Sequence, residues 1–330
     1  MTSEIIFLGA QDVRSLLSIE DCIHAVEQAF RLYGDGKARG PQVLGMHSAE
    51  GGFHIKAGLL DLEAHYFAAK INGNFPLNPE RFGLPTIQGI LVLCDAEKGT
   101  PLAIMDSRDV TSLRTAAATA VAAKYLARAN SQTVTICGCG EQGRIQVKAL
   151  AHIFKLKNVF AYDSSPATAQ QCAAELSRTL NVPVTTVNKV RPATTQSDIC
   201  VTCTPTQQPF LGPDDVMDGT FVAAVGADNP HKNEVHAALM SKAKVVCDLV
   251  EQCAVMGDLH HALESCVMQR TDVFAELGEI VAGKKPGRKS DQEITIFDST
   301  GMALQDVAAA GLVYERAVAR NAGVHLNPAA

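Results

Sequence analysis

Three glycines near the middle of the chain have the spacing of a loop that binds a diphosphate. Gly138, Gly140 and Gly143 follow an apolar run at 133–137 and open a helical pattern over 141–154. In such a loop the first glycine permits a tight turn, and the second lets the backbone approach the pyrophosphate. The third lets the helix pack closely on the strand, with its positive N-terminal end aimed at the anion. The spacing therefore predicts a dinucleotide-binding site.

An acidic residue at the right distance from these glycines indicates which dinucleotide is bound. The strand-like run 158–163 ends in Asp163, which lies 163 − 143 = 20 residues after Gly143. A carboxylate there would accept hydrogen bonds from the hydroxyls of the adenosine ribose. The three residues that follow, Ser-Ser-Pro, offer no cation to a 2′-phosphate. The sequence therefore favours NAD over NADP.

Three charged residues stand where they could bind or protonate a small anionic substrate. Lys70 lies within an apolar strand pattern, where its ammonium must be paired or held by a ligand. Arg114 lies one turn into a helix of small residues, where its guanidinium could form a fork with a carboxylate. Asp228 follows a strand at the edge where doubly wound folds bind ligands, and could act as general base and acid. The alternatives are a solvent-facing strand lysine, a helix-surface ion pair and an aspartate that starts a turn.

The composition describes a compact protein without a nucleic-acid or membrane partner. The chain has 330 residues, of which 47% are hydrophobic and 19% charged, and its net charge is −6. That length suits two domains, and the mild acidity argues against nucleic acid, which usually requires a basic stripe. The sequence has no run of about 18 apolar residues and no secretory signal pattern. Because the ten cysteines fit reduced thiols, we expect a cytoplasmic protein.

The cysteine and histidine groups are weak candidates for metal or redox sites. Cys200 and Cys203 have the C-x-x-C spacing, but they lie in a strand-like apolar run, where cysteine behaves as a small hydrophobe. His260 and His261 are adjacent, and two further histidines flank Glu234. Neither group repeats the spacing of a helical zinc motif. We therefore expect no metal.

The first 128 residues predict a helix followed by an antiparallel sheet. Ser18 and Asp21 fit a capping box, and apolar residues recur at helical spacing up to Gly34. Short strand-like runs separated by turns then predict a meander. These runs are 43–47, 53–60, 66–72, 88–95 and 101–106. Asp109 is expected to cap a helix that continues to about residue 128.

From about residue 131 the pattern alternates between strands and helices, which is typical of a doubly wound parallel sheet. After the first two strands, the further candidates are 184–187, 198–204, 220–226, 244–249 and 293–298. The fold class is therefore α/β, with an NAD-binding Rossmann domain over 129–301. A last helix, 301–320, is expected to pack back on the first part, so that 1–128 and 302–330 form a discontinuous α+β substrate-binding and dimerisation domain. We expect the active site in the cleft between the two domains.

Five motifs, in order along the chain, resemble the ornithine cyclodeaminase/mu-crystallin family. They are Ala69–Pro76, Leu84–Gly89, Leu113–Ala117, Ala224–Asp228 and Asp298–Gly301. The resemblance implies a homodimer with a Rossmann domain, and chemistry that passes through an imino acid by moving a hydride to or from nicotinamide. Members of the family include cyclodeaminases, amino-acid dehydrogenases, imino-acid reductases and the mu-crystallins.

The resemblance also implies roles for individual residues. Lys70 would contact the substrate carboxylate and the reacting centre, with Arg114 and Thr86 also on the carboxylate. Asp228 would exchange protons with the substrate nitrogen. Cofactor contacts are implied for the residues of the glycine loop, for Asp163, for Thr115 and for the ends of other strands. The full set is Gly138, Gly140, Glu141, Gln142, Gly143, Asp163, Thr115, Cys203, Thr204, Gly226, Ser299 and Thr300.

Two departures from the family pattern bear on the substrate. Ornithine cyclodeaminases carry a glutamate in the second strand that helps to hold the side-chain amine of ornithine. This chain has His54 and Lys56 there, and like charges would repel a diamino acid. We therefore expect an apolar or acidic side chain on the substrate. The arginine that commonly follows the first helix is shifted to Arg39, or its role has passed to Lys56 or Gln42.

The sequence thus predicts an NAD(H)-dependent enzyme that interconverts a 2-imino acid and an L-amino acid. One alternative is a cyclodeaminase, in which NAD is used without net consumption. The other is a nucleotide-dependent protein that binds a small ligand with little turnover, as mu-crystallins can.

Overall fold

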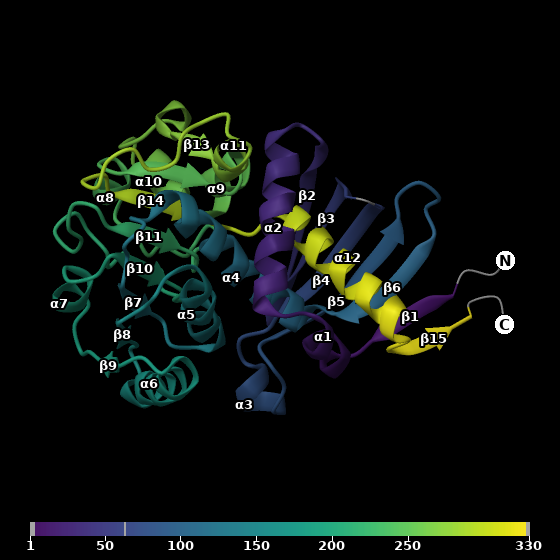
Figure 1. The fold of residues 1–330 in the computed structure, drawn as a ribbon. Coiled ribbons are helices and arrows are strands. Elements are labelled where there is room, and N and C mark those ends of the chain that lie inside the picture. The colour runs from purple at the N-terminus through teal and green to yellow at the C-terminus, as the bar shows by residue number, and fades with distance from the viewer. Residues whose placement is uncertain (1–3, 63, 328–330) are drawn as a thin grey trace. The chain divides into compact units, whose positions relative to one another are not determined.

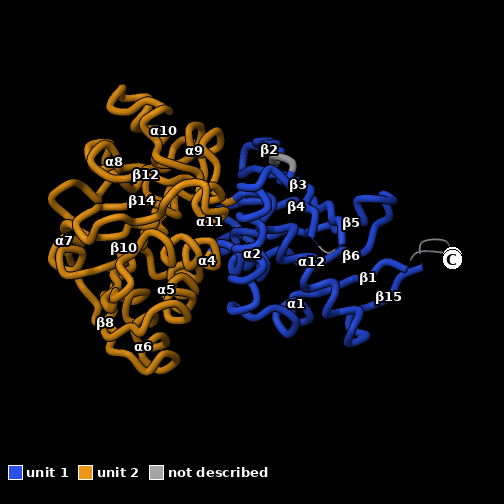
Figure 2. The backbone as a smooth tube through the Cα atoms, turned by 45° about the horizontal axis from the view of Figure 1, so that its top comes forward, with its two compact units in different colours: residues 1–115, 302–330 blue, residues 116–301 orange. Residues whose placement is uncertain are grey.

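The computed structural model describes residues 4–62 and 64–327, apart from the side chains of residues 39–41. Arg39, which the family pattern singles out, therefore has its side chain outside the described residues. The chain divides into two compact units (Figure 2). Unit 1 comprises residues 1–115 and 302–330, and unit 2 comprises residues 116–301. Within the described residues, no helix is long and apolar enough to cross a membrane.

Unit 1 is built on a seven-stranded sheet with the strand order β15-β1-β6-β5-β4-β3-β2. The strands are β1 (Ile5–Leu8), β2 (Ala38–Ser48), β3 (Gly51–Asp61), β4 (His65–Asn74), β5 (Ile87–Asp95), β6 (Pro101–Asp106) and β15 (Val324–Leu326). Each consecutive pair of strands from β2 to β6 is antiparallel, so the predicted meander is confirmed. Strands β1 and β15, which were not predicted from the sequence, extend the sheet beyond β6.

Two long helices cover one face of this sheet (Figure 1). Helix α2 (Ile19–Gly34) is capped by Ser18, whose side chain accepts a hydrogen bond from the backbone of Asp21, as the capping pattern predicts. Helix α12 (Ala303–Arg320) packs against α2, β3 and β4. The approach is close, because a Cβ added to Gly58 of β3 would lie 3.1 Å from the Leu304 side chain. Two short helices, α1 (Ala10–Leu16) and α3 (Asn78–Phe82), complete this part of the unit.

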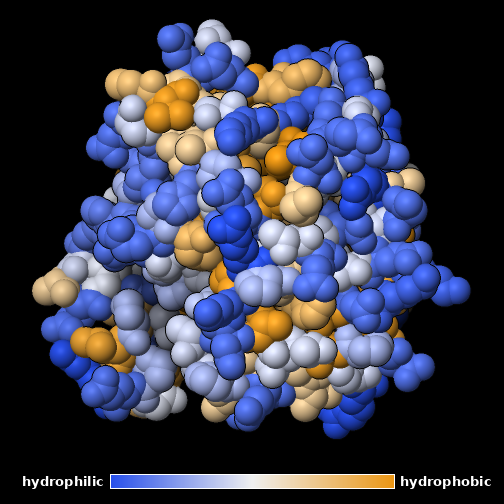
Figure 3. Space-filling view, turned by 90° about the vertical axis from the view of Figure 1, so that its left-hand side faces the viewer, coloured by the Kyte–Doolittle hydropathy of each residue, from blue (hydrophilic) through white to orange (hydrophobic). Residues whose placement is uncertain are grey.

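The opposite face of the unit 1 sheet leaves large apolar side chains exposed. Successive residues of a strand point to opposite faces, so the even-numbered residues of β3 and β4 face α12 and the odd-numbered ones face away. On the outward face, Phe53, Ile71 and Ile90 are 45%, 37% and 43% exposed. With α3 they line a groove of about 930 Å³. By contrast, on the face that Figure 3 shows, hydrophilic residues prevail and hydrophobic residues lie in small groups among them.

Unit 2 contains an eight-stranded sheet in the order β13-β12-β14-β11-β10-β7-β8-β9. The strands are β7 (Thr133–Cys137), β8 (Asn158–Tyr162), β9 (Val184–Thr186), β10 (Ile199–Thr202), β11 (Phe221–Ala224), β12 (Lys244–Cys247), β13 (Ala275–Glu276) and β14 (Thr295–Asp298). All neighbouring strands run parallel. The predicted doubly wound sheet is therefore confirmed, with β13 as a strand that the sequence analysis missed.

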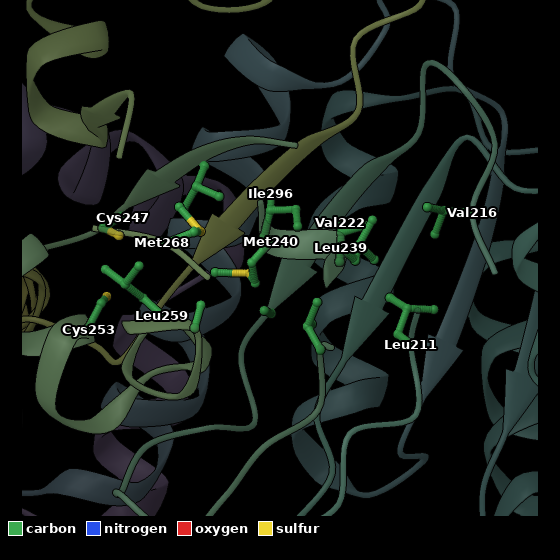
Figure 4. Close-up of a cluster of buried hydrophobic side chains, with 14 of the residues drawn as sticks. Leu211, Val216, Val222, Leu239, Met240, Cys247, Cys253, Leu259, Met268 and Ile296 are labelled. Carbon is green, nitrogen blue, oxygen red and sulfur yellow. The ribbon is translucent and has the colours of Figure 1, made fainter. Parts of the chain in front are cut away.

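Helices connect these strands and enclose the core of unit 2. They are α5 (Glu141–Ile153), α6 (Pro166–Leu180), α7 (Arg191–Thr194), α8 (Ala237–Met240), α9 (Val250–Met256), α10 (Asp258–Glu264) and α11 (Leu277–Val281), with the 3-10 turn η1 (Arg270–Asp272). Figure 4 shows part of the core, a buried cluster to which the strands contribute Val222 and Ile296 and the helices contribute Met240 and Leu259. This packing fixes the strand ends on which the following loops stand.

Helix α4 (Ser107–Leu126) begins three residues earlier than a cap at Asp109 would place it. The Asp106 side chain accepts a hydrogen bond from the backbone N–H of Arg108, and so satisfies a free amide at the start of the helix. Asp109 lies in the first turn and forms an ion pair with Arg14 at 3.2 Å. The prediction that Asp109 caps this helix is therefore wrong.

Candidate active site

A buried cluster of charged side chains joins β4, α4 and α12 in unit 1. Oδ1 of Asp306 accepts a hydrogen bond from Nζ of Lys70 at 2.8 Å and another from Nε of Arg114 at 2.9 Å. Nη1 of Arg114 donates to Oε1 of Gln305 at 3.1 Å. All four residues are buried, with Lys70 3% and Arg114 5% exposed. Two residues that the sequence analysis proposed separately are thus brought together by one carboxylate.

The local structure explains why these side chains meet. Lys70 is an even-numbered residue of β4 and so points towards α12, whose first turn carries Asp306. Lys56 of β3 lies directly opposite Lys70 in the antiparallel register. Residues directly opposite in this way share a face, with their Cβ atoms about 5 Å apart. A second cation therefore stands beside the Lys70 ammonium.

The cluster carries more positive than negative charge. Burial, and then the charges of Arg114 and Lys56, lower the pKa of Lys70 to about 7, although Asp306 acts in the opposite direction. Burial alone would raise the pKa of Asp306, but Arg114 and Lys70 outweigh it and hold that pKa below its ordinary value. One carboxylate thus faces three cationic side chains. This balance favours an incoming anion.

The cluster also has hydrogen-bonding capacity left over. Lys70 uses one of its three ammonium protons on Asp306, and no hydrogen bond joins Nη2 of Arg114 to another described residue. Oδ2 of Asp306 and Nε2 of Gln305 are buried and have no partner among the described residues. Buried polar atoms are costly when left unsatisfied. The arrangement is therefore suited to a polar ligand.

Two further residues with a proposed substrate role lie at different distances from this cluster. His54 precedes Lys56 by two residues on the same face of β3 and pairs with Asn72 of β4. Thr86 lies just before Ile87, which pairs with Asn74, four residues along β4 from Lys70. At about 3.3 Å per residue, that is about 13 Å along the strand. The structure therefore does not bring Thr86 to the Lys70 ammonium.

The glycine loop of unit 2 has the geometry that its spacing predicts. Gly138 has a φ of +96°, and a Cβ there would lie 2.7 Å from the carbonyl oxygen of Cys203. A Cβ on Gly143 would lie 1.9 Å from the carbonyl oxygen of Gly138, so α5 starts close against β7 only because residue 143 is glycine. A Cβ on Gly140 would meet nothing within 4 Å. Open space therefore lies beside this glycine at the start of α5, whose positive N-terminal end carries Glu141 and Gln142.

Asp163 connects the end of β8 to the glycine loop. Its Oδ2 accepts a hydrogen bond from the backbone of Cys139 at 2.8 Å, and its Oδ1 accepts one from the backbone of Ser165 at 2.9 Å. A carboxylate has about four acceptor positions, so both oxygens can still receive a hydroxyl. Arg144 is the nearest cation along α5, but its guanidinium is bound to the Cys139 carbonyl and to Glu175. No basic group is therefore provided for a 2′-phosphate by this helix.

A buried glutamate that the sequence analysis did not propose joins two of the strand ends. Oε1 of Glu234 accepts from the backbone N–H of Thr204 at 2.6 Å and from its hydroxyl at 2.7 Å. Oε2 accepts from the Thr202 hydroxyl at 2.7 Å and from the backbone N–H of Gly226 at 2.8 Å. Burial and the nearby Asp258 carboxyl raise the pKa of Glu234 to about 7. Glu234 thus holds the ends of β10 and β11 together.

Gly226 accommodates this glutamate because it has no side chain. A Cβ on Gly226 would lie 2.5 Å from Oε2 of Glu234. Cys203 directly follows β10, between Thr202 and Thr204, and is half-buried. Burial raises the pKa of its thiol well above the ordinary value. It is therefore a neutral thiol at neutral pH.

The remaining residues with a proposed cofactor role have hydrogen bonds within their own units. The hydroxyls of Ser299 and Thr300 donate to the two oxygens of Asp248 at 3.2 and 3.3 Å. The Thr115 hydroxyl donates to the carbonyl oxygen of Thr111, one turn earlier in α4, at 2.8 Å. These hydroxyls are thus engaged inside the protein, and any contact with a cofactor would be additional to them.

Asp228 is exposed just after the end of β11. Its side chain is 49% exposed and forms an ion pair with Nζ of Lys232 at 2.8 Å. Nδ2 of Asn229 lies 3.4 Å from the same oxygen. A carboxylate at the surface with a second oxygen unengaged by these contacts can exchange protons with a ligand or with solvent.

Two groups of side chains among the described residues have possible metal ligands within reach of one another. They are Cys247, Cys253 and Asp298, and His260, His261 and Glu264. In the first group burial raises the pKa of the Cys253 thiol, and Asp298 already accepts the backbone N–H of Leu259 at 2.8 Å. Metal ligands must be deprotonated, so a neutral thiol does not favour an ion. In the second group a ring nitrogen of His261 lies 2.9 Å from the carbonyl oxygen of Lys232.

Three residues of these networks, Asp306, Gln305 and Glu234, were not predicted from the sequence. Asp306 is the single acid in the apolar stretch from Met302 to Val313, and a lone acid there must be paired when the helix is buried. Gln305 lies beside it. Glu234 stands between two histidines, and no local spacing in the sequence links it to the strand ends that it joins.

Comparison with known proteins supports the same fold over nearly the whole chain. The sequence pattern of the ornithine cyclodeaminase/mu-crystallin family matches residues 3–321. A solved archaeal alanine dehydrogenase, a dimer with bound NAD, is 39% identical and has a TM-score of 0.94, covering 98% of this chain and 99% of that one. The Δ1-pyrroline-2-carboxylate reductase of Thermococcus litoralis, solved with NADH and L-proline, is 32% identical with a TM-score of 0.94, covering 98% and 100%. The iminosuccinate reductase of Paracoccus denitrificans is 31% identical over 328 residues, 97% of this chain and 98% of its own.

These similarities extend well beyond the nucleotide-binding unit, because each covers unit 1 as well as unit 2. The chain therefore belongs to the ornithine cyclodeaminase/mu-crystallin family.

Proposed function

We propose that this protein is an NAD(H)-dependent oxidoreductase that interconverts a 2-imino acid and an L-amino acid. The observation that carries the proposal is the buried cluster of Lys70, Arg114 and Asp306, in which cationic donors outnumber the carboxylate that holds them. The relatives named above include an alanine dehydrogenase and two imino-acid reductases, all of which act on 2-amino or 2-imino carboxylates.

The substrate carboxylate is proposed to bind at this cluster. Nη2 of Arg114 and the remaining protons of Lys70 provide charge-assisted donors, which are stronger than neutral ones. In a buried site the interaction is little screened by solvent. Lys56, opposite Lys70, adds a further positive charge on the same face. The family role for Thr86 stays a prediction, because its position just before β5 is remote from this cluster.

NAD is proposed as the cofactor of unit 2. The residues fit it: the glycine loop leaves open space at Gly140, and Asp163 keeps acceptor capacity at the end of β8. Cys203, Thr204 and Gly226 would line the neighbouring strand ends, which Glu234 holds in place. When bound, the reduced cofactor supplies the hydride. All three relatives named above were solved with NAD or NADH.

Proton transfer is assigned to Asp228 and Lys70. Asp228 is exposed at the end of β11 and would exchange a proton with the substrate nitrogen as general acid and base. Lys70, with a pKa near 7, can hold or release a proton at neutral pH. A general acid or base works best when its pKa lies near the working pH.

The substrate side chain is proposed to be small and apolar, or acidic. The face of β3 beside Lys70 carries Lys56 and His54, which would repel the second ammonium of ornithine. Incubation with L-ornithine and catalytic NAD should therefore give no proline or ammonia. Substantial ammonia release without net change in NADH would instead identify a cyclodeaminase.

We propose that the active form of the enzyme is a cytoplasmic homodimer. The outward face of the unit 1 sheet exposes Phe53, Ile71 and Ile90 around an apolar groove, and large exposed apolar surfaces are typical of interfaces. The archaeal alanine dehydrogenase is a dimer. All ten cysteines are free thiols, which fits a reducing compartment.

The experiment that tests the function is a substrate panel read at the NADH absorbance band in both directions. Pyruvate with ammonia, a cyclic imino acid and iminosuccinate would be supplied with NADH or NADPH, and L-alanine, L-proline and L-aspartate with NAD. Net oxidation of NADH by one imino acid, with NADPH used poorly, is expected. Tight ligand binding with negligible turnover throughout would refute the proposal and favour a mu-crystallin-like binding protein.

A further inference from the structure

Asp306 lies at the centre of the carboxylate-binding cluster, although it is itself an anion and cannot bind a substrate carboxylate. It is 1% exposed, and two cations from different elements meet on its single oxygen Oδ1. Its other oxygen, Oδ2, is buried and has no hydrogen bond with a described residue. An anion in this position opposes a bound carboxylate by charge, so its presence requires an explanation.

The explanation lies in what the two cations would do without it. Burial favours the neutral form of a lysine, and each neighbouring cation favours it further. Lys70 is buried, faces Arg114, and has Lys56 opposite it on β3. Asp306 is the acidic side chain hydrogen-bonded to Lys70. It therefore supports the proton that makes Lys70 a cation.

We propose that Asp306 is a positioning residue for the reaction: it keeps Lys70 protonated and fixes the directions in which Lys70 and Arg114 present their remaining donors to the substrate carboxylate. The proposal rests on the function assigned above. By engaging Nε of Arg114, Asp306 turns the guanidinium so that Nη1 meets Gln305 and Nη2 remains available. Gln305 thus supports the orientation of Arg114 without touching the charge of Lys70.

The groups around Lys70 come from five packed elements. Helix α12 provides Asp306, α4 provides Arg114, and β3 provides Lys56. On β5 the residue opposite Lys70 is Leu91, which is fully buried and apolar. Helix α2 adds Cys22, close enough to Arg114 and Asp306 to feel their charges, and burial raises the pKa of this thiol to about 12. Cys22 is therefore neutral, and the balance around Lys70 is set by Asp306 against Arg114 and Lys56.

Opposite signs follow for two substitutions. In Asp306→Asn the pKa of Lys70 should fall, because the charge that raises it is lost. In Lys56→Gln the pKa of Lys70 should rise, because a charge that lowers it is lost. A neighbouring opposite charge shifts a pKa by about 1–3 units, or about tenfold or more in proton affinity. If Asp306 and Lys56 served only to stabilise the fold, the two substitutions would not shift the pKa of Lys70 in opposite directions.

The test measures how tightly a simple carboxylate binds at different pH values. Propionate has no amine, so its competitive inhibition against the amino-acid substrate reports the cations of the cluster alone. In the natural enzyme, inhibition should weaken as pH rises through the pKa of Lys70, about 7. In Asp306→Asn that transition should lie at lower pH by about one unit or more, and in Lys56→Gln at higher pH. Gln305→Leu is the matched control, which should raise KM but leave the transition where it is.

Two results would overturn the proposal. One is an unchanged transition in Asp306→Asn; the other is a transition in Gln305→Leu that moves as far as in Asp306→Asn. NADH binding, followed by its fluorescence, checks that each variant is folded. If Asp306→Asn does not fold, Asp306→Glu decides: it keeps the charge and so the transition, while the displaced carboxylate should raise KM, and an unchanged KM would refute positioning. Failure of the natural enzyme to turn over any imino acid would count against the proposed function instead.

Discussion

At the scale of single residues, the candidate site combines charges that are individually unfavourable to bury. Lys70, Arg114 and Asp306 are tolerated in the interior because each is hydrogen-bonded to an opposite charge. The net charge nevertheless stays positive. A ligand with one carboxylate would therefore relieve an electrostatic cost that the free protein carries, which is how a buried site gains affinity for an anion.

The two cations should contribute to catalysis and not to cofactor binding. Lys70→Ala or Arg114→Ala should lower kcat/KM by about 2–4 kcal/mol of transition-state stabilisation, because a buried charged partner of the substrate is lost. NADH affinity should remain nearly unchanged. The measurement is steady-state kinetics with NADH titrations. Arg178→Ala removes an exposed cation of α6 and is the control; near-normal turnover of either cluster variant would remove that residue from the site.

Asp163 should determine which dinucleotide is used. Replacing it with serine, together with Ser164→Arg, removes the carboxylate that would repel a 2′-phosphate and adds a cation to meet one. The ratio of kcat/KM for NADPH to that for NADH should rise. Because Asp163 also binds the backbone of Cys139 and Ser165, the absolute activity should fall with both cofactors. Equal use of both cofactors by the natural enzyme would contradict this role.

How far the sequence alone could define the site also depends on single residues. The glycine loop and Asp163 could be predicted because their spacing along the chain determines how they lie in the fold. The loop residues are Gly138, Gly140 and Gly143. Asp306 was not, because its partner Arg114 lies 192 residues earlier and nothing in local spacing links the two. Pairing over that distance is decided by the packing of α12 on β3 and β4, which only the folded chain reveals.

At the scale of elements, the ends of parallel strands are held by buried carboxylates. Glu234 connects β10 and β11, and Asp248 connects the end of β12 to the residues after β14. Four donors converge on Glu234. Such a carboxylate fixes loops that would otherwise have unsatisfied backbone N–H groups.

Glu234→Gln should therefore destabilise unit 2 and weaken NADH binding. The amide places an N–H group against donors, so that up to two of the four hydrogen bonds are lost, at about 1–3 kcal/mol for each unsatisfied group. Chemical denaturation and NADH titration measure the two effects. Glu251→Gln, an exposed glutamate of α9 paired with Arg270, is the matched control and should change stability by less than about 0.5 kcal/mol. Equal free energies of unfolding for the two variants would show that the hydrogen bonds to Glu234 do not stabilise the protein.

Strands could be predicted where several follow one another along the chain. The prediction failed where the two paired strands are far apart in the sequence. The meander from β2 to β6 follows from alternating patterns with short turns. Strands β1 and β15 are four and three residues long and pair Ile5 with Leu326, from opposite ends of the chain. Runs so short carry almost no periodic signal, and their partner cannot be inferred from neighbours in sequence.

At the scale of the whole molecule, the open apolar face of unit 1 should be a dimer interface. The double variant Phe53→Asp and Phe82→Asp places two charges in the groove, where Phe82 is 68% exposed. Charges there would be desolvated on association, so the dimer should dissociate. Light scattering after size-exclusion chromatography measures the mass. Val255→Asp with Val267→Asp, two exposed apolar residues of unit 2, is the control and should remain dimeric.

A monomeric mass for the natural protein, or an unchanged dimer in the groove variant, would argue against this face. NADH binding to the groove variant should persist in either case, because the substitutions lie in unit 1. That measurement separates loss of association from loss of folding.

Helix α12 is synthesised after the elements it covers, and this order affects how the chain folds during synthesis. Asp306 is synthesised 236 residues after Lys70 and 192 residues after Arg114, with the whole of unit 2 between them. At about 5–20 residues per second, the ribosome needs about 10–40 s to add those 192 residues. During that interval the inward face of the β3–β4 sheet lacks its covering helix, and two cations destined for the interior have no counter-charge. The newborn chain should therefore depend on a chaperone most strongly just before its last thirty residues appear.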